Sequence, residues 1–468
     1  MTFSSFPFLF MFLPIVFALY FVCRNDLVRN ILLVIASLFF YAFGEPTAVI
    51  IMIASIILNY LFGRLAAGEK TAKPAVVMAV AANIGMLAVF KYSGFFAETF
   101  NSITHLGIPV PQIRLPIGIS FFTFQGLSYV IDVYRDKSLE QKSLLKMALF
   151  ISLFPQLIAG PIVKYNEISG QLGHREFSSE RVTKGITRFI IGLGKKVLIS
   201  NNMGLFVDKA FAESPKDLSC LTSWIAALCY MLQIYYDFSG YSDMAIGLGC
   251  MFGFDFMENF NYPYISGSVQ EFWRRWHISL STWFKNYVYI PLGGNRVSKG
   301  RTILNRCIVF FLTGFWHGAN FTFIVWGMLH GAFLLLEEVG IIPTKKNWFK
   351  PLGHIYTVLV AMLTFVIFRA NTLTQAGRIL GNMFTGAHGD RAVNVSLMTT
   401  LEPVFFIALA VAVIFSAPIL PKLRDRLMKS KAAAVCDYAG HIAVLGIFAL
   451  CILSLVSSSY NPFIYFRF

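Results

Sequence analysis

Two histidines lie inside a run that is otherwise apolar enough for lipid: His317 and His330, in "FWHGANFTFIVWGMLHG" (315–331). A charged imidazole is costly in hydrocarbon, so each must be neutral, hydrogen-bonded or facing a cavity, which makes both candidates for proton-transfer chemistry. The alternative is a hydrogen bond between helices. For His330 this alternative has equal weight, because Gly331 and Ala332 suit close helix packing.

The neighbours of His317 favour a functional role for it. Trp316, Gly318 and Asn320 surround this histidine and supply a small-residue gap for a substrate and an amide donor nearby. The seven cysteines lie mostly in apolar runs without C-x-x-C spacing, so we predict neither a disulfide framework nor a metal site. These residue types alone leave the reaction open.

The stretch 254–302 is the longest one that is too polar to span a membrane and too aromatic to be a linker. We therefore predict an interfacial helix there. At helical spacing, His277 lies on one face of this helix with apolar and aromatic residues, and polar residues lie on another face. We therefore expect His277 to point inward. The first face holds Trp273, His277, Leu280 and Phe284, and the second holds Arg274, Ser281 and Lys285.

The composition places these histidines in a polytopic membrane protein. Hydrophobic residues make up 56% of the 468 residues, charged residues make up 13%, and the mean hydropathy is +0.65. A soluble domain of this length is far less apolar. Spanning helices need roughly 20 apolar residues, and the alternating segments of about ten residues that are typical of a barrel do not occur. We predict an all-α fold.

Several apolar segments are too short or too interrupted to be simple spans. Glycine and proline break "LPIGISFFTFQGLSYV" (115–130) and "LFPQLIAGPIV" (153–163), which predicts broken or re-entrant helices covered by protein or by an aqueous cavity. We predict about 11 to 13 transmembrane or re-entrant helices around a central tunnel, in a single domain over 1–468. The lack of an internal repeat disfavours a secondary transporter.

The net charge of +15 would suggest nucleic-acid binding in a soluble protein. Here the basic residues gather in short loops between spans, which membrane topology explains better, so we expect no nucleic-acid partner. Arg24 and Arg29 follow the first span, and a basic cluster at 422–431 precedes the last one. The positive-inside rule places both loops in the cytoplasm and both termini outside. The first apolar segment lacks a cleavage site and is expected to remain as a helix.

Six segments spread over most of the chain form a recognisable set. They are "LPIGISFFTFQGLSYVIDVYR" (115–135), "FPQLIAGPIVKY" (154–165), "QIYYDFSGYSDMAIGLG" (233–249), "FWRRWHISLSTWFKNYVYIPLGG" (272–294), "FWHGANFTFIVWGMLHG" (315–331) and "FVIFRANTLTQA" (365–376). Together they resemble the membrane-bound O-acyltransferase family. Within it they resemble the bacterial polysaccharide branch, closest to the members that O-acetylate alginate, peptidoglycan or other exported glycans.

The resemblance implies a tunnel in which a cytosolic acyl thioester meets an acceptor from the other side. The family's invariant histidine falls on His317, and its second polar position, an asparagine in many eukaryotic branches, falls on His277. Acyl transfer needs a base for the acceptor hydroxyl, and an imidazole with an ordinary pKa of about 6.5 suits that task. We predict His317 as the base, and His277 or Asn320 as donors to the oxyanion. Acetyl-CoA is the expected donor substrate, with no bound cofactor.

Charged residues near these motifs have further candidate roles. Asp237 and Asp243 in "YYDFSGYSD" are six positions apart, a spacing that does not hold them on one helix face. A break at Gly240 would favour capping or tunnel lining over catalysis. Three basic residues could bind phosphates of coenzyme A or of lipid head groups, the alternative being a solvated interfacial face: Arg274, Arg275 and Lys285.

The C-terminal segment 459–468 is rich in aromatic residues, whereas an ordinary tail would be polar. We predict that it folds back into an external funnel, the alternative being an interfacial aromatic anchor. The resemblance associates such a motif with passing the acyl group to an extracytoplasmic partner, and Tyr465 matches its tyrosine. His317 would then activate Tyr465 or a partner serine. The chain lacks a Gly-x-Ser-x-Gly segment, so an SGNH-type partner outside the membrane is expected to modify the glycan.

These features together predict an O-acyltransferase of the bacterial cytoplasmic (inner) membrane, which delivers acetyl groups outward to an exported or cell-wall polysaccharide. One alternative is D-alanyl transfer toward teichoic acid, with a cytosolic carrier protein bringing the thioester. Another is a glycan or ion transporter whose histidines relay protons. A transporter would show flux without covalent transfer.

Overall fold

The computed structural model of the protein describes residues 1–430 and 433–464. Helices and no strands form this part of the chain, as the composition predicts. Its contacts divide the chain into two units, the first made of Met1–Phe189 with Ser242–Glu258 and the second of Ile190–Tyr241 with Asn259–Phe468.

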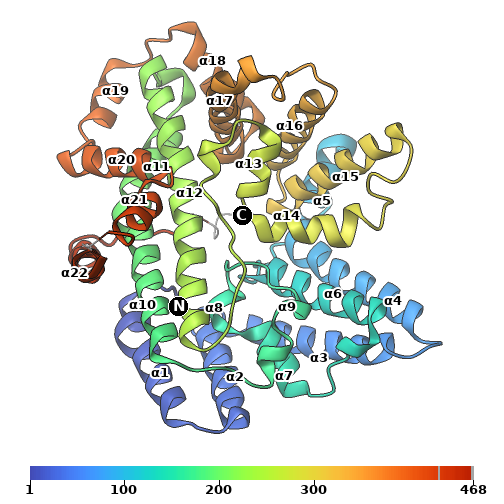
Figure 1. Ribbon diagram of the computed structural model, residues 1–468. Coiled ribbons are helices and arrows are strands. Elements are labelled where there is room, and N and C mark those ends of the chain that lie inside the picture. Colours follow the sequence, from blue (N-terminus) through green and yellow to red (C-terminus); the bar gives the residue numbers. More distant parts are fainter. Residues whose placement is uncertain (431–432, 465–468) are drawn as a thin grey trace. The chain divides into compact units, whose positions relative to one another are not determined.

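The first unit is built around apolar helices near the N-terminus, among which α3, α4 and α6 pack on one another (Figure 1). The predicted break in 153–163 is confirmed, because α8 is a separate four-residue helix directly after α7. In 115–130, Gly118, with φ of 77°, only precedes α6, which is continuous through Gly126, so no break lies within this helix. The helices are α1 (Leu13–Val22), α2 (Asp26–Ala42), α3 (Ala48–Ala66), α4 (Ala72–Leu87), α5 (Ser93–Thr104), α6 (Ile119–Arg135), α7 (Leu144–Ser152), α8 (Phe154–Leu157), α9 (Tyr165–Ile168) and most of α10 (Ser179–Gly194).

The second unit contains an extended aromatic core. A π-helical segment, Lys195–Ser200, joins α10 to α11, and the long helix α12 contributes to both units. The helices are α11 (Asn201–Ala212), α12 (Cys220–Met251), α13 (Val269–Arg275), α14 (Ile278–Phe284), α15 (Lys299–His317), α16 (Phe321–Glu338), α17 (Lys350–Arg369), α18 (Leu373–Thr385), α19 (Arg391–Met398), α20 (Pro403–Phe415), α21 (Ile419–Leu427) and α22 (Ala433–Ser457).

The protein is a multi-pass membrane protein. Within the described residues, five helical segments are long and apolar enough to cross a membrane. The pair α19 and α20, bent by 75°, makes a sixth if the two helices are counted as one broken span. The larger predicted number counts re-entrant segments as well and stays a prediction. The five segments are Ala48–Ala66, Ala72–Thr104, Phe321–Glu338, Asn347–Arg369 and Ala433–Ser457.

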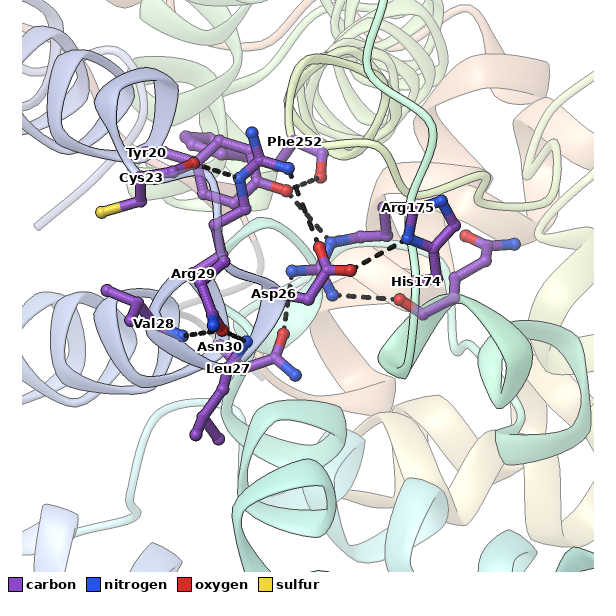
Figure 2. A network of polar contacts seen from close by, with 12 residues as sticks. Tyr20, Cys23, Asp26, Leu27, Val28, Arg29, Asn30, His174, Arg175 and Phe252 are labelled. Carbon is purple, nitrogen blue, oxygen red and sulfur yellow. Dashed lines mark hydrogen bonds and ion pairs between the residues drawn. The ribbon is translucent and has the colours of Figure 1, made fainter.

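A buried arginine ties the ends of α1 and α2 to the loop after α9 in the first unit (Figure 2). Arg175 is 3% exposed, and it donates to the Tyr20 hydroxyl at 3.0 Å and to Asn30 Oδ1 at 2.8 Å. The Tyr20 hydroxyl in turn donates to the carbonyl of Phe252 at 2.8 Å. Because a buried guanidinium needs its hydrogen bonds satisfied, this network holds the last turn of α1 and the beginning of α2 in place.

A glycine contact positions the end of α15 that carries His317. A Cβ added to Gly314 would clash with the carbonyl of Phe323, so α15 and α16 approach closely only because this residue is glycine. Asn320 then begins α16, its Oδ1 accepting the backbone N–H of Thr322 at 3.0 Å. The turn between the two helices therefore follows directly from the sequence.

Two predictions about helix breaks are wrong. The segment 254–302 is not one interfacial helix, because α13 ends at Arg275 and α14 begins after His277, which has φ of 44°. Conversely, α12 is continuous through Gly240. This glycine serves close packing instead, since a Cβ there would lie 2.7 Å from the carbonyl of Gly192.

Candidate functional site

A small cavity in the second unit has His317 in its wall. Aromatic rings from α12, α16 and α17 form half of the lining, and the C-terminal segment contributes one residue. Hydrocarbon and ring surfaces exclude water and strengthen every electrostatic interaction inside such a site. The lining residues are Ile234, Phe238, Trp276, His317, Trp326, Phe365, Phe368 and Ile464.

His317 is the last residue of α15 and is buried, with 6% of its surface exposed. Its imidazole meets the rings of Trp326 and Phe368 edge to face, with centroids 5.2 Å and 5.1 Å away. The ring of Trp316 lies 4.9 Å from it. Aromatic packing therefore holds this imidazole at the cavity wall, where the sequence predicted a functional histidine.

His277 is buried among aromatic residues, as predicted, although by a different backbone path. Its Nδ1 lies 3.2 Å from Asn259 Oδ1, which also accepts the backbone N–H and the hydroxyl of Ser279. Because an amide oxygen only accepts, the neutral imidazole carries its proton on Nδ1. Burial lowers the pKa of His277 to about 3, so this neutral form is the relevant one.

The protonation of His277 leaves its Nε2 as a hydrogen-bond acceptor. This atom is buried and has no hydrogen-bond partner among the described residues. The predicted role of His277 as a donor to an oxyanion is therefore not supported by this arrangement. Trp316 lies between the two site histidines in ring contacts, with centroids 6.0 Å from His277 and 4.9 Å from His317, which brings the predicted histidines into one aromatic cluster.

Asn320, the other predicted oxyanion donor, is occupied elsewhere. Its Oδ1 caps α16, and its Nδ2 donates to the carbonyl of Asn371 at 2.9 Å. Both ends of the amide thus hold the turn between α15 and α16 and the chain after α17. The structure assigns this residue a capping role.

His330 takes the structural role that the sequence left open. The indole N–H of Trp273 donates to His330 Nδ1 at 3.3 Å, so the neutral imidazole has its proton on Nε2 and donates to Thr364 Oγ1 at 2.9 Å. Thr364 donates onward to the carbonyl of Val360. These bonds join α13, α16 and α17, which is the predicted alternative of helix–helix hydrogen bonding.

A buried ion pair that the sequence did not reveal joins the π-helical segment Lys195–Ser200 to α12. Lys196 Nζ is 2.6 Å from Asp237 Oδ1, and the two side chains are only 4% and 2% exposed. The π-helical segment at Lys195–Ser200 places this lysine toward α12. Two adjacent lysines in an apolar run gave no signal of which one turns inward.

Asp243, the second carboxylate of the motif, has partners of its own in the first unit. Arg188 donates to Asp243 Oδ1 at 2.8 Å and also binds both carboxylate oxygens of Glu258. The structure thus gives Asp237 and Asp243 separate partners. Both carboxylates are engaged in ion pairs, and their roles beyond these contacts stay a prediction.

The three basic candidates of the interfacial segment differ in their surroundings. Arg274 and Lys285 are exposed, whereas Arg275 is held by Glu271 at 2.9 Å and donates to the carbonyl of Asn261. Phosphate binding by these residues stays a prediction.

Residues 460–464 of the C-terminal segment pack on α11, α12 and the π-helical segment, whereas the external funnel stays a prediction. Asp237 Oδ2 accepts the backbone N–H of Ile464 at 2.8 Å, and Lys196 Nζ donates to the carbonyl of Pro462. The ring of Phe463 stacks on that of Tyr241 with centroids 4.6 Å apart. The ion pair of Lys196 and Asp237 therefore serves as an anchor for the segment whose last described residue, Ile464, lines the His317 cavity.

A second anchor holds the start of this segment. The hydroxyl of Tyr460 donates to Asp208 Oδ2 at 2.7 Å, and Arg369 donates to the other oxygen of Asp208 at 3.0 Å. Asn201 also donates to the carbonyl of Tyr460 at 3.3 Å. The predicted relay residue, Tyr465, lies outside the described residues.

Comparisons with known proteins agree over most of the chain. Residues 78–375 match the membrane-bound O-acyltransferase family (MBOAT). The chain is 40% identical to the probable alginate O-acetylase AlgI of Azotobacter vinelandii over 100% of both sequences. It is 37% identical to the peptidoglycan O-acetyltransferase of Helicobacter pylori, covering 83% of this chain and 80% of that protein. Similarity to the teichoic acid D-alanyltransferase of Streptococcus thermophilus is lower, at 29% identity over 54% of this chain and 68% of that protein.

Proposed function

The chain belongs to the membrane-bound O-acyltransferase family, and from this premise we propose that it O-acetylates an exported or cell-wall polysaccharide. The observation that carries the proposal is the buried His317 in a cavity lined by the C-terminal segment, in a chain similar over its whole length to an alginate O-acetylase. Acetyl transfer is favoured over D-alanyl transfer because the D-alanyltransferase relative aligns with only about half of the chain.

His317 acts as the general base in this proposal. A neutral imidazole removes the proton of an acceptor hydroxyl as the oxygen attacks the thioester carbonyl, and it then protonates the departing thiolate. The aromatic packing around His317 supports this role, because it keeps the ring in one position at the cavity wall and excludes bulk water. His277 presents an acceptor nitrogen in the same cluster and is a candidate second base.

The acyl donor is acetyl-CoA, a substrate of the reaction, and the chemistry needs no bound cofactor. Exposed Arg274 and Lys285 are candidates for contacts with phosphates of the donor or of lipids. The donor side of the protein faces the cytosol of a bacterial inner membrane, with both termini outside. The basic residues after the first apolar helix, Arg24 and Arg29, and the basic cluster at 422–431 support this orientation.

The acetyl group leaves through the C-terminal segment. Tyr465 is the proposed relay, since it follows Ile464, a residue of the cavity wall. His317 would activate its hydroxyl, the acetyl group would form a tyrosyl ester, and an SGNH-type partner outside the membrane would take it for the glycan. Direct activation of a partner serine by His317 is the competing route.

The experiment that tests this function supplies two donors to membranes that contain the protein and an SGNH-type partner. One is radiolabelled acetyl-CoA, and the other is a carrier protein charged with labelled D-alanine. We expect acetyl to reach the glycan and D-alanine to be inert. Label only from the charged carrier would overturn the acetyl assignment. Full acetyl transfer by a Tyr465→Phe protein would exclude the tyrosyl ester while leaving the acetyl assignment intact.

A further inference from the structure

The cavity around His317 contains few groups that can donate a hydrogen bond. Five of its eight lining side chains are aliphatic or phenyl groups. The side chains with an N–H are His317, Trp276 and Trp326. A tetrahedral intermediate formed here would carry a negative oxygen, and in such an apolar site that charge needs a donor at close range.

Trp326 has the hydrogen-bonding feature expected of such a donor. Its side chain is 1% exposed, and its indole Nε1 is buried with no hydrogen-bond partner among the described residues. An indole N–H can only donate, and buried donors are nearly always paired. Two other tryptophans of this unit follow that rule, since Trp273 donates to His330 Nδ1 and Trp224 donates to the carbonyl of Met383.

The packing fixes Trp326 against the predicted base. Its ring and that of His317 meet edge to face, with centroids 5.2 Å apart and planes at 88°. Phe368 contacts both rings, at 4.9 Å from Trp326 and 5.1 Å from His317. A base and a donor held rigidly beside one cavity is the arrangement that electrostatic preorganisation requires.

The side chains first considered for this role do not have a free donor. Neutral His277 carries its proton on the nitrogen that faces Asn259, and Asn320 uses its amide to hold two turns. Trp326 remains among the cavity-lining side chains, with an indole N–H that has no partner in the described part of the chain.

We propose that Trp326 is a catalytic residue, whose indole N–H donates a hydrogen bond to the oxyanion of the tetrahedral intermediate. This inference rests on the proposed function. The acceptor hydroxyl oxygen bonds to the thioester carbonyl carbon, its proton passes to His317, and the carbonyl π electrons move to the oxygen that Trp326 binds. When the carbonyl re-forms, the carbon–sulfur bond breaks and the thiolate takes the proton from His317.

The test replaces the N–H while keeping the shape of the ring. Incorporation of 3-(3-benzothienyl)alanine at position 326 puts sulfur in place of the indole nitrogen, and Trp326→Phe serves as a genetically simpler second variant. Removing one oxyanion donor lowers kcat by roughly 100-fold to 1000-fold. We expect a fall of that size for both variants, with the KM for acetyl-CoA within about threefold of wild type because the donor acts on the transition state.

The matched control is the same benzothienyl replacement at Trp273, a buried tryptophan that lies outside the cavity lining. It loses a hydrogen bond to His330, so lower thermal stability with kcat within about fivefold of wild type is expected. A benzothienyl variant at 326 with wild-type kcat would refute the oxyanion role, as would equal losses of kcat at 326 and 273. If the wild-type protein transfers no acetyl from acetyl-CoA, the proposed function fails, and this inference fails with it.

Discussion

The buried ion pair of Lys196 and Asp237 gives the sharpest stability prediction. Substitution of Asp237 by Asn keeps the size of the side chain and removes its charge. The Lys196 ammonium, 2.6 Å away and only 4% exposed, would then be buried without a countercharge. The same change weakens the hydrogen bond that Asp237 accepts from the backbone of Ile464.

The expected cost follows from these contacts. Removing one partner of a buried ion pair destabilises a protein by about 3 to 5 kcal/mol, because the remaining charge stays desolvated. Removing both charges avoids that penalty. The double variant with Lys196→Met and Asp237→Asn should therefore be more stable than Asp237→Asn alone, which is a strong departure from additivity.

A carboxylate on the same helix provides the matched control. Asp243→Asn leaves Arg188 with its second partner, Glu258, and this group of side chains is 15% to 57% exposed. Loss of the Asp243 charge should lower the free energy of unfolding by about 1 kcal/mol or less. The free energy of unfolding would be measured in mixed detergent with increasing dodecyl sulfate. Digestion by carboxypeptidase reports on the C-terminal segment, which Asp237→Asn should expose.

A cost of Asp237→Asn no larger than that of Asp243→Asn would contradict the stabilising role of the ion pair. Additive costs of Lys196→Met and Asp237→Asn in the double variant would contradict it as well. Unchanged resistance to carboxypeptidase in Asp237→Asn would separately contradict the anchoring of the C-terminal segment.

Three further changes have defined outcomes. Burial lowers the pKa of His277 to about 3, whereas the pKa of an unfolded histidine is about 6.5. The stability that the neutral imidazole contributes is therefore complete above pH 6.5 and is lost as the pH falls toward 3. In parallel unfolding curves, wild type should lose about 2 kcal/mol more than His277→Gln between pH 7 and 5. Gly240→Ala brings a Cβ 2.7 Å from the carbonyl of Gly192, and thermal unfolding should show a cost of about 1 to 3 kcal/mol; a neutral result would contradict the close packing. Arg175→Met leaves the buried Asn30 amide oxygen without its 2.8 Å donor, which should cost about 1 to 3 kcal/mol, with faster proteolysis near α1 as the readout; stability equal to wild type would remove this network as a structural tie.

The sequence predicted the helical class well, because helix formation and apolar character depend on local signals. It also singled out His277 and His317, whose rings both contact Trp316 in the structure. An apolar run that contains His317 beside small residues indicates a candidate functional position, because ionisable side chains are rare within membrane-spanning segments. The aromatic tail likewise predicted its own burial, and Phe463 with Ile464 is buried in the structure.

The sequence predicted less about contacts that join distant segments. The helix face that carries His277 has uninterrupted helical spacing, yet the helix breaks there, where Asn259, eighteen positions away, binds its imidazole. Gly240 suggested a break, because glycine weakens a helix. Glycine also allows two helices to pack closely, and the sequence around Gly240 does not show whether another segment packs there. The pairing of Lys196 with Asp237 depends on a π-helical turn that propensities do not indicate.

The proposed role of His317 as the general base is tested most directly by comparing it with a second buried histidine, His330. Membranes that contain His317→Gln or His330→Gln would be supplied with labelled acetyl-CoA and the extracytoplasmic partner, and acetyl on the glycan would be counted. Loss of a general base should lower transfer by about 100-fold to 10,000-fold in His317→Gln. His330→Gln, which alters only helix–helix hydrogen bonds, should stay within about tenfold of wild type. Near-wild-type transfer by His317→Gln would contradict the central claim that this imidazole is the base.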